Sequence, residues 1–186
     1  MIEVTQGRLV DQPVAALLLS ANNQLNAGSG WSLECERLCR PGYCAECREV
    51  AAATGREGLP RGSAVVTGGG KLAQGGRRRW ILQAITIRYE PDGTRVKASP
   101  RIVHRAVRTA LEKAELFRIE SVATYLMVQK ADYRNGTADE MAEALFRALV
   151  DHAAVASSVK RIVVCAADAA EEARARQAHV RARQAR

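Results

Sequence analysis

The feature that most constrains the fold of this chain is an alternation of short apolar, β-branched runs with longer segments of helical periodicity. Several runs are continuous rather than alternating in polarity, which is typical of strands that are buried on both faces. Strands that alternate with helices predict an α/β domain with a mainly parallel or mixed sheet between helical layers. We expect the strands at residues 2–4, 14–19, 64–67, 80–87, 122–128 and 161–165.

Short helical patterns occupy the first quarter of the chain and its end. Residues 31–39 and 44–53 predict two short helices that are separated by Pro41-Gly42. The Ala- and Arg-rich segment 169–186 predicts a C-terminal basic helix or tail outside a domain of residues 1–168. Its acidic residues precede its arginines, which is the charge order that suits a helix dipole.

Two longer helices are expected in the second half of the chain. Pro100 stands at the first position of one of them, over residues 100–116. Thr137, with Glu140 three residues later, has the pattern of a capping box at the start of the other, over residues 137–153. The apolar stripes that we expect to face the core are Ile102, Val103, Ala106, Val107, Ala110, Leu111 and Ala114 in the first helix, and Met141, Ala144, Leu145, Ala148 and Leu149 in the second.

Length and composition fit one globular domain. The chain has 186 residues, of which 47% are hydrophobic and 26% charged, so it can bury a core and is not disordered as a whole. No apolar run approaches the roughly 18–20 residues of a membrane span. Residues 1–5 lack the basic and apolar regions of a secretory signal. We therefore expect a cytoplasmic protein with no membrane partner.

Positive charge is concentrated in two segments. The formal net charge is +8, and arginines gather at residues 77–79 and in the C-terminal segment. Such patches attract phosphate-bearing partners, so a nucleic-acid or protein interaction module is one function to consider. Aromatic residues make up only 4% of the chain, which argues against base stacking. For the C-terminal segment we prefer a solvated helix; packing of this helix on a second subunit of a homo-oligomer is the alternative.

A small-residue loop carries the strongest sign of a binding site. The buried run 14–19 is followed by residues 20–26 and Gly28-Ser29-Gly30, and Trp31 opens a helix. Glycines let the backbone approach phosphate oxygens, and a helix amino end offers free N–H groups and the positive end of a dipole. Sheets of this class bind ligands at the carboxyl ends of their strands. The loop therefore suits a diphosphate, although the same residues also form ordinary turns.

The order of several short motifs resembles the macro domain family over roughly residues 2 to 165. The family pattern runs Gly-Asp-Ile, then Asn-Ala-Ala-Asn, then a glycine-rich loop and a helix. This chain has Gly7-Arg8-Leu9, then Leu19-Ser20-Ala21-Asn22, then the loop that leads to Trp31. Gly62-Ser63-Ala64 is similar to the family's Gly-Glu-Ala strand, and Trp80-Ile81-Leu82-Gln83 stands where the family often has Tyr-Val-Ile-His.

The resemblance implies a three-layer α/β/α macro-domain-like fold with a mixed central sheet, and it implies a bound ligand. That ligand is ADP-ribose or a related nucleotide or phosphorylated molecule, with Asn22 facing the distal ribose. No cofactor and no metal is implied. The residues that the resemblance places at the ligand are Asn22, Gly28, Ser29, Gly30 and Trp31.

Departures from the family pattern mark a divergent member. Arg8 stands where the family has an Asp that binds the adenine amino group, and a guanidinium has no acceptor. Leu19 replaces the first Asn of its motif, and Ser32 replaces an Asp of many members that hydrolyse ADP-ribosyl esters. The second phosphate loop, 128–136, has one glycine. We expect nucleotide binding without strong catalysis; ADP-ribosyl hydrolysis, and a domain that has lost this ligand, are the alternatives.

Four of the five cysteines are close in sequence. Cys35 and Cys39 are one helical turn apart, and so are Cys44 and Cys47, so four thiolates could converge on a tetrahedral metal ion. The spacing is not a standard zinc pattern. We prefer the alternative that some of these cysteines are small buried residues of a helical pair, without a metal. Disulfides are not expected in a cytoplasmic protein.

The histidines form no recognisable catalytic motif. The chain has His104, His152 and His179, and none stands beside a Ser or Cys in a nucleophile motif. A single His on a helix is more often a surface or hydrogen-bonded side chain than a base. We therefore assign no catalytic residue from the sequence.

Overall fold

Strands and helices alternate throughout the computed structural model, which describes residues 1–26, 30–55, 57–73, 80–128, 137–155 and 157–185. The strands are β1 (Ile2–Gln6), β2 (Ala16–Asn22), β3 (Ala64–Gly68), β4 (Trp80–Tyr89), β5 (Arg95–Val96), β6 (Ser121–Tyr125) and β7 (Arg161–Ala166). The helices are α1 (Gly30–Cys39), α2 (Gly42–Ala53), α3 (Pro100–Leu116), α5 (Ala138–Ala153) and α6 (Ala169–Gln184), with short 3-10 turns η1 (Leu9–Asp11) and η2 (Gly70–Ala73).

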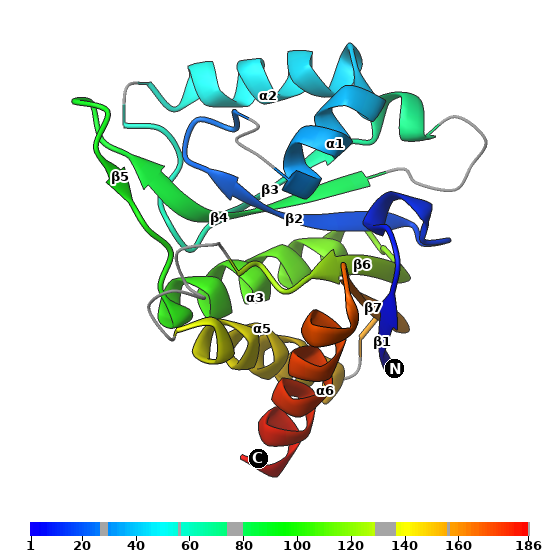
Figure 1. Cartoon of the computed structure of the whole chain (residues 1–186). Helices are drawn as coiled ribbons and strands as arrows, with labels where there is room; N and C mark the ends of the chain where they lie inside the picture. Colours follow the sequence, from blue (N-terminus) through cyan, green and yellow to red (C-terminus); the bar gives the residue numbers. More distant parts are fainter. Residues whose placement is uncertain (27–29, 56, 74–79, 129–136, 156, 186) are drawn as a thin grey trace.

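The strands form one seven-stranded mixed sheet. Its order is β1-β7-β6-β2-β4-β3, and β5 pairs with β4 outside this path. The first five strands of that order are parallel, whereas β3 and β5 run antiparallel to β4. The parallel strands therefore bring their carboxyl ends to one edge of the sheet, which we call the carboxyl edge. For β2 and β4 it lies at the left of Figure 1.

Helices cover both faces of this sheet. In Figure 1, α1 and α2 lie on one face, and α3, α5 and α6 lie on the other. Side chains alternate between the faces along each strand, so that Leu18 of β2 packs on the α3 side while Leu17 and Leu19 pack on the α1 side. The predicted three-layer α/β/α fold is confirmed.

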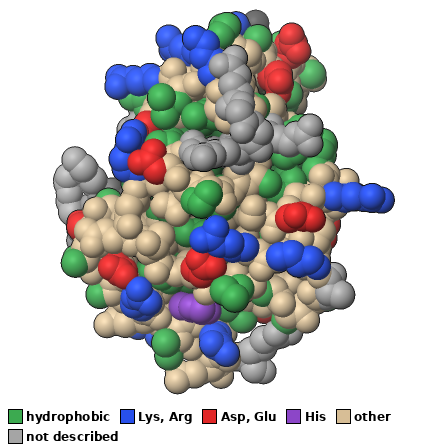
Figure 2. Space-filling model, turned by 90° about the vertical axis from the view of Figure 1, so that its right-hand side faces the viewer, with side chains coloured by type: hydrophobic (Ala, Val, Ile, Leu, Met, Phe, Trp, Pro, Cys, Tyr) green, Lys and Arg blue, Asp and Glu red, His purple; other side chains and the backbone are tan. Residues whose placement is uncertain are grey.

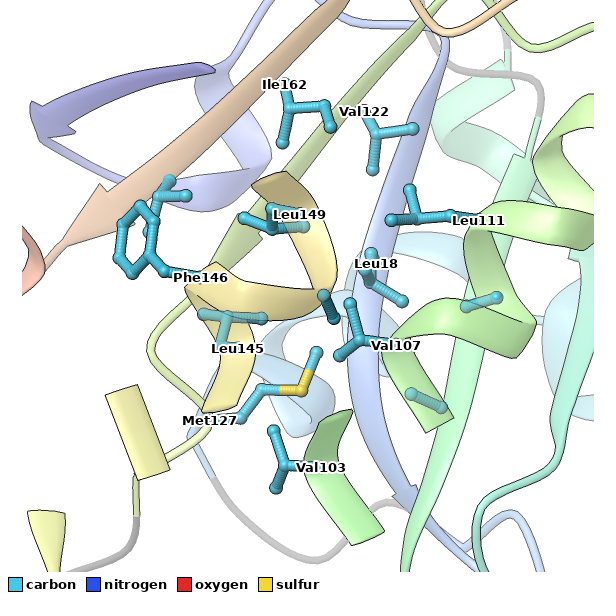
Figure 3. Packing of buried hydrophobic residues seen from close by; sticks show 14 of the residues in the cluster. Leu18, Val103, Val107, Leu111, Val122, Met127, Leu145, Phe146, Leu149 and Ile162 are labelled. Atoms are coloured by element: carbon cyan, nitrogen blue, oxygen red, sulfur yellow. The ribbon is translucent and has the colours of Figure 1, made fainter. Parts of the chain in front are cut away.

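The larger core cluster lies between the sheet and helices α3, α5 and α6. Its buried members are aliphatic side chains and alanines together with Phe146, Met127 and Met141. The stripes predicted for the two long helices are buried, apart from the half-buried Ile102. Figure 3 shows how the side chains of α3 and α5 meet those of the strands; it labels Leu18, Val103, Val107, Leu111, Val122, Met127, Leu145, Phe146, Leu149 and Ile162.

The strand expected at 122–128 ends earlier than its apolar run. β6 stops at Tyr125, although Leu126 and Met127 remain buried. Met127 has a φ of 33°, which is not an extended conformation. The apolar run continues because the chain still packs in the core, as the labelled Met127 side chain in Figure 3 shows. The two-residue strand β5 was missed, because so short a strand leaves no periodicity to detect.

The capping box expected at Thr137 is wrong. Thr137 precedes α5, but its side chain makes no capping hydrogen bond. A reciprocal cap instead begins α6, where the Asp168 carboxylate accepts from the Glu171 N–H at 2.8 Å and the Glu171 carboxylate accepts from the Ala167 N–H at 2.9 Å. The first bond satisfies a free backbone donor in the first turn of the helix, and the second fixes the chain just before the helix.

Helix α6 packs on the rest of the molecule through small side chains. Ala175, Ala178 and Ala182 are buried in the larger core cluster. Its arginines pair with carboxylates, as in Arg174–Asp139 at 2.6 Å and Arg181–Glu143 at 3.6 Å. Further basic and acidic side chains are interspersed over the face shown in Figure 2. The arginines at 77–79 lie outside the described residues. No described helix is both long and apolar enough to cross a bilayer.

Candidate functional site

The candidate site lies at the carboxyl edge, where the segments that follow β1, β2 and β6 leave the sheet. β2 and β6 are hydrogen-bonded neighbours, with Ala16 opposite Val122 and Leu17 opposite Ala123. The residues that leave both strands have unusual backbone conformations. Leu25 after β2 has a φ of 55°, and Met127 after β6 has a φ of 33°. Non-glycine residues in such conformations cost about 1–3 kcal/mol each and tend to cluster at functional sites.

The Asn22 side chain holds the turn that follows β2. It is 7% exposed, and its Oδ1 accepts hydrogen bonds from the backbone N–H groups of Gln24 at 3.0 Å and Asn26 at 3.2 Å. Its Nδ2 donates to the Asn26 carbonyl at 2.6 Å. Both ends of the amide therefore bind the backbone of residues 24–26. That Asn22 faces a ligand stays a prediction; its described contacts position the loop.

The neighbouring Asn23 is a structural residue that the sequence reasoning missed. It is fully buried, and its Oδ1 accepts from the Tyr89 N–H at 2.8 Å. Its Nδ2 donates to the carbonyls of Glu57 at 3.0 Å and Tyr89 at 3.1 Å. A Cβ added to Gly58 would lie 2.4 Å from the Asn23 carbonyl oxygen, so this approach requires glycine. Asn23 thus fastens the end of β2 to two distant segments.

The amino end of α1 reaches the same edge. Gly30 begins the helix with a φ of 57°, and a Cβ placed there would meet no atom within 4 Å. Glycine is therefore favoured here by backbone conformation, with open space beside it. No acidic residue stands in the first turn of α1, so the positive end of the helix dipole is not neutralised from within the helix. Of the predicted site residues, Gly28 and Ser29 lie outside the described residues.

An aromatic pair and two serines connect α1 to the strands. The rings of Trp31 and Tyr125 lie 6.4 Å apart at 45°. The Tyr125 hydroxyl accepts from the Ser20 N–H at 3.3 Å, and the Ser32 hydroxyl donates to the Ser20 carbonyl at 3.0 Å. Burial raises the pKa of the Tyr125 hydroxyl, so the group stays protonated at neutral pH. Asn22, Gly30 and Trp31 are thus all placed around the β2–α1 junction.

Arg8 after β1 is tied to α1. Its guanidinium pairs with the Glu34 carboxylate, and more weakly with Asp11 at 3.5 Å. The partners hold the Arg8 side chain along the surface between the end of β1 and α1. Sequence reasoning missed Glu34, because its partner lies 26 residues away.

The cysteines do not form a metal site. Cys35, Cys39 and Cys47 are buried, Cys44 is half-buried, and none of them forms a disulfide. Among the residues that the structure describes, no group of three or more His, Cys, Asp or Glu side chains is arranged to hold a metal ion. The alternative in which four thiolates converge on a metal ion is not supported by the described residues, and the preferred interpretation of small buried residues in a helical pair holds for three of the four.

A buried polar network replaces that metal site on the α1/α2 face. The Tyr43 hydroxyl donates to Gln83 Oε1 at 3.1 Å. Gln83 Nε2 donates to Cys47 Sγ at 3.3 Å and to Thr67 Oγ1 at 3.4 Å. Burial raises the pKa of both Tyr43 and Cys47, so the network is neutral. Beside it lies a cavity of about 680 Å³ between residues 24–26 and helices α1 and α2.

A Ser, a His and a Glu also meet, at the opposite edge of the sheet. His152 Nε2 lies 2.9 Å from Ser157 Oγ and 3.0 Å from Glu115 Oε1. A hydrolytic triad needs the serine and the acid on different ring nitrogens, and here the same nitrogen faces both. Glu115 also accepts from the hydroxyl and N–H of Ser158. This cluster therefore holds the segment before β7 and is not an activated nucleophile.

Comparison with known proteins agrees with the fold. The macro domain sequence profile matches residues 19–130, a span that contains the β2–α1 junction and β6. The chain belongs to the macro domain family. A macro domain-containing protein of Streptomyces griseus is 33% identical over 85 residues, and one of Streptomyces nogalater is 36% identical over 84 residues. The alignments cover 46% and 45% of this chain and 46% and 44% of those proteins, about half the length of each relative.

Solved macrodomains share the whole architecture at low sequence identity. An Oceanobacillus iheyensis macrodomain mutant with ADPR has a TM-score of 0.76 and 16% identity, and the match covers 100% of this chain and 94% of that one. A Trypanosoma brucei macrodomain in complex with ADP-ribose has a TM-score of 0.69 and 16% identity, with 95% and 68% covered. At these identities the likeness establishes the fold of this macro domain.

Proposed function

We propose that this macro domain binds ADP-ribose or a related diphosphate nucleotide at the carboxyl edge, beside the β2–α1 junction. The observation that carries the proposal is the Asn22 side chain, which fixes residues 24–26 by three hydrogen bonds. This turn leads the chain toward the amino end of α1. A pre-organised loop that ends at a helix amino terminus is a favourable place for phosphate oxygens. Macrodomains of the same fold are described with ADPR and ADP-ribose.

Each described residue of the junction has a role in this proposal. Gly30 lets the backbone approach the diphosphate, because its side is open and its φ is positive. The first turn of α1 supplies N–H donors and the positive end of its dipole. Trp31 and Tyr125 form an aromatic wall at the end of β6. Asn22 is a positioning residue, since its amide is engaged with the loop backbone.

The side chains that we propose for contact with the adenine differ from those that the family pattern implies. Arg8 has donors only, so it cannot accept a hydrogen bond from an adenine amino group. The Glu34 carboxylate that pairs with Arg8 is an acceptor, and its side chain is 28% exposed. We propose that Glu34 supplies the acceptor that Arg8 lacks, with Arg8 holding that carboxylate in place.

The test is a calorimetric titration of the reduced protein with ADP-ribose, ADP and ribose 5-phosphate. We expect binding of ADP-ribose that is weakened at least about tenfold in Asn22→Ala, the loss of roughly one or two hydrogen bonds. The matched control is Asn26→Ala, which removes an exposed side chain from the same turn. Thermal unfolding of each variant separates a lost site from a lost fold. A folded wild-type protein that gives no heat at millimolar ADP-ribose would overturn the proposal.

The role of Glu34 is tested with two alanine variants of residues on the same helix. Glu34→Ala should weaken ADP-ribose but leave ribose 5-phosphate unchanged, because only the former carries adenine. Glu36→Ala, on the same helix and paired instead with Arg40, should change neither affinity. If Glu34→Ala binds ADP-ribose as tightly as wild type does, the adenine lies elsewhere, whereas the diphosphate site at the junction is unaffected by that result.

A further inference from the structure

Cys44 differs from the other cysteines in its position. It is the third residue of α2 and is half-buried, whereas Cys35, Cys39, Cys47 and Cys165 are buried. Cys44 lines the cavity of about 680 Å³ described above, together with Cys47. Cys35 and Cys39 are 0% exposed in the adjoining core. Only one of the five thiols therefore combines access from solvent with a place in a cavity.

The surroundings of Cys44 are electropositive. It stands in the first turn of α2, where backbone N–H groups lack helical partners and the helix dipole is positive. The residue before that helix, Pro41, makes no side-chain capping hydrogen bond. Arg40, two residues before the start of that helix, lines the same cavity as Cys44. Partly exposed thiols in electropositive sites are the ones that react as nucleophiles.

The acids near this site are already engaged. Glu36 pairs with Arg40, and Glu46 accepts from the Gly68 N–H at 2.6 Å. Arg48 also lines the cavity, and no ion pair or hydrogen bond of its guanidinium is found within the described part of the chain. The cavity therefore presents a cationic group to an incoming molecule, beside the guanidinium of Arg40. A small molecule with carboxylates fits this charge.

Cys47 supplies a second thiol on the same side of α2. Residues three apart on a helix lie on one face, with Cβ atoms about 5–6 Å apart. A disulfide needs about 3.5–4.5 Å between Cβ atoms, so joining the two sulfurs requires the first turn of α2 to tighten. The Cys47 thiol accepts a hydrogen bond from Gln83, which also has to break. Burial raises the pKa of Cys47, so it reacts after Cys44 and more slowly.

We propose that Cys44 is a site of S-thiolation by small disulfides that carry carboxylates, and that Cys47 is its resolving thiol. In the first step the Cys44 thiolate attacks one sulfur of the disulfide, its S–S bond breaks, and one small thiolate leaves. In the second step Cys47 loses its proton to solvent and attacks the Cys44 sulfur, and the other small thiolate leaves. Two protein thiols are oxidised to one disulfide, and the small disulfide is reduced to two thiols.

The test uses the reduced full chain and oxidised glutathione, followed by intact-mass and peptide mass spectrometry over time. We expect a mixed disulfide at Cys44 first, formed at least about tenfold faster than at any other cysteine. A Cys44–Cys47 disulfide should then replace it. Cys47→Ser should stop at the mixed disulfide, and Cys44→Ser should leave the protein unmodified on the same timescale. Cys165→Ser, which removes a buried thiol outside the cavity, should behave as wild type.

The dependence of the modification rate on the charge of the small disulfide distinguishes a thiol in an anion-binding cavity from a thiol that is merely exposed. Arg48→Gln should slow modification by anionic oxidised glutathione several-fold and should not slow modification by cystamine, a cationic disulfide. Circular dichroism establishes that each variant is folded. Labelling of Cys44 no faster than of the same residue in urea-unfolded chain would overturn the proposal. First labelling at Cys35, Cys39 or Cys47 would overturn it as well.

Discussion

The two faces of the sheet are built from different kinds of side chain. Beneath α3, α5 and α6 the buried side chains are mostly aliphatic and rich in alanine, and the buried Thr124 hydroxyl donates to the Leu18 carbonyl at 3.0 Å. Beneath α1 and α2 the cluster contains Tyr43 and several cysteines, adjoins the buried amide of Gln83, and borders a cavity of about 680 Å³. The first face stabilises the fold mainly by apolar burial. The other keeps polar groups that each need a partner, and both of our proposals place their chemistry there or at its edge.

The sharpest contrast should come from deleting a large side chain on the apolar face. Phe146 is fully buried and stacks on His179 with ring centroids 5.3 Å apart. Phe146→Ala should lower the free energy of unfolding by about 3–5 kcal/mol, since it removes buried surface and leaves a cavity. Denaturant unfolding measures this, with the half-exposed Phe117 as the matched control. Phe117→Ala should cost about 1 kcal/mol. Equal costs would show that the apolar face is not the main source of stability.

The polar face should instead show coupling between partners. Gln83→Met leaves the Tyr43 hydroxyl without its acceptor, and Tyr43→Phe leaves Gln83 Oε1 without its donor. Each single change should cost about 1–3 kcal/mol, because a buried polar group loses its partner. The double variant should cost less than the sum by at least about 0.5 kcal/mol. Additive costs would mean that water satisfies these groups and that the network is not closed.

A smaller effect tests the ionic cluster at the end of α3. Hydrogen bonds from Ser157 and Ser158 overcome the effect of burial and lower the pKa of Glu115 from 4.5 to about 2. A depressed pKa contributes stability that is present above pH 4.5 and is lost as the pH falls toward 2. Glu115→Gln should cost about 1 kcal/mol at pH 7, and the difference from wild type should shrink between pH 5 and 2.

His152 provides the internal check on that pH series. Burial lowers its pKa below 6.5, so the unfolded chain takes up its proton first and stability falls as the pH drops below about 6.5. This loss has the same sign in wild type and in Glu115→Gln. Unfolding curves recorded from pH 7 to 2 should therefore show two stages in wild type and a smaller lower stage in the variant, because the pKa values of Glu3 and Asp92 are lowered too. A lower stage of unchanged size in the variant would assign it to those other carboxylates.

The fold could be predicted from the sequence because the patterns that indicate its helices and strands are local. The stripe from Val103 to Ala114 repeats with the helical period, and buried strands such as β2 are continuous apolar runs. Sequence reasoning placed the junction at Asn22 and Gly30 through family motifs. It missed Asn23 and the Arg8–Glu34 pair, because their partners are 26–66 residues away in sequence. Sequence reasoning also could not predict which cysteine is accessible to solvent, since Cys44 differs from the others in exposure and not in spacing.

Asn23 has a consequence for how the molecule opens. The amides of Leu59 and Tyr89 donate to its backbone and side-chain oxygens at 2.9 Å and 2.8 Å, although Leu59 lies in a loop and Tyr89 ends a strand. Hydrogen exchange at the Tyr89 amide requires the release of a fully buried side chain, and exchange at the Leu59 amide requires the loop to leave the backbone of the same residue. They should belong to the slowest cooperative unit of the domain. The end of β2, from which the loop of the proposed nucleotide site departs, is then as long-lived as the core beneath it.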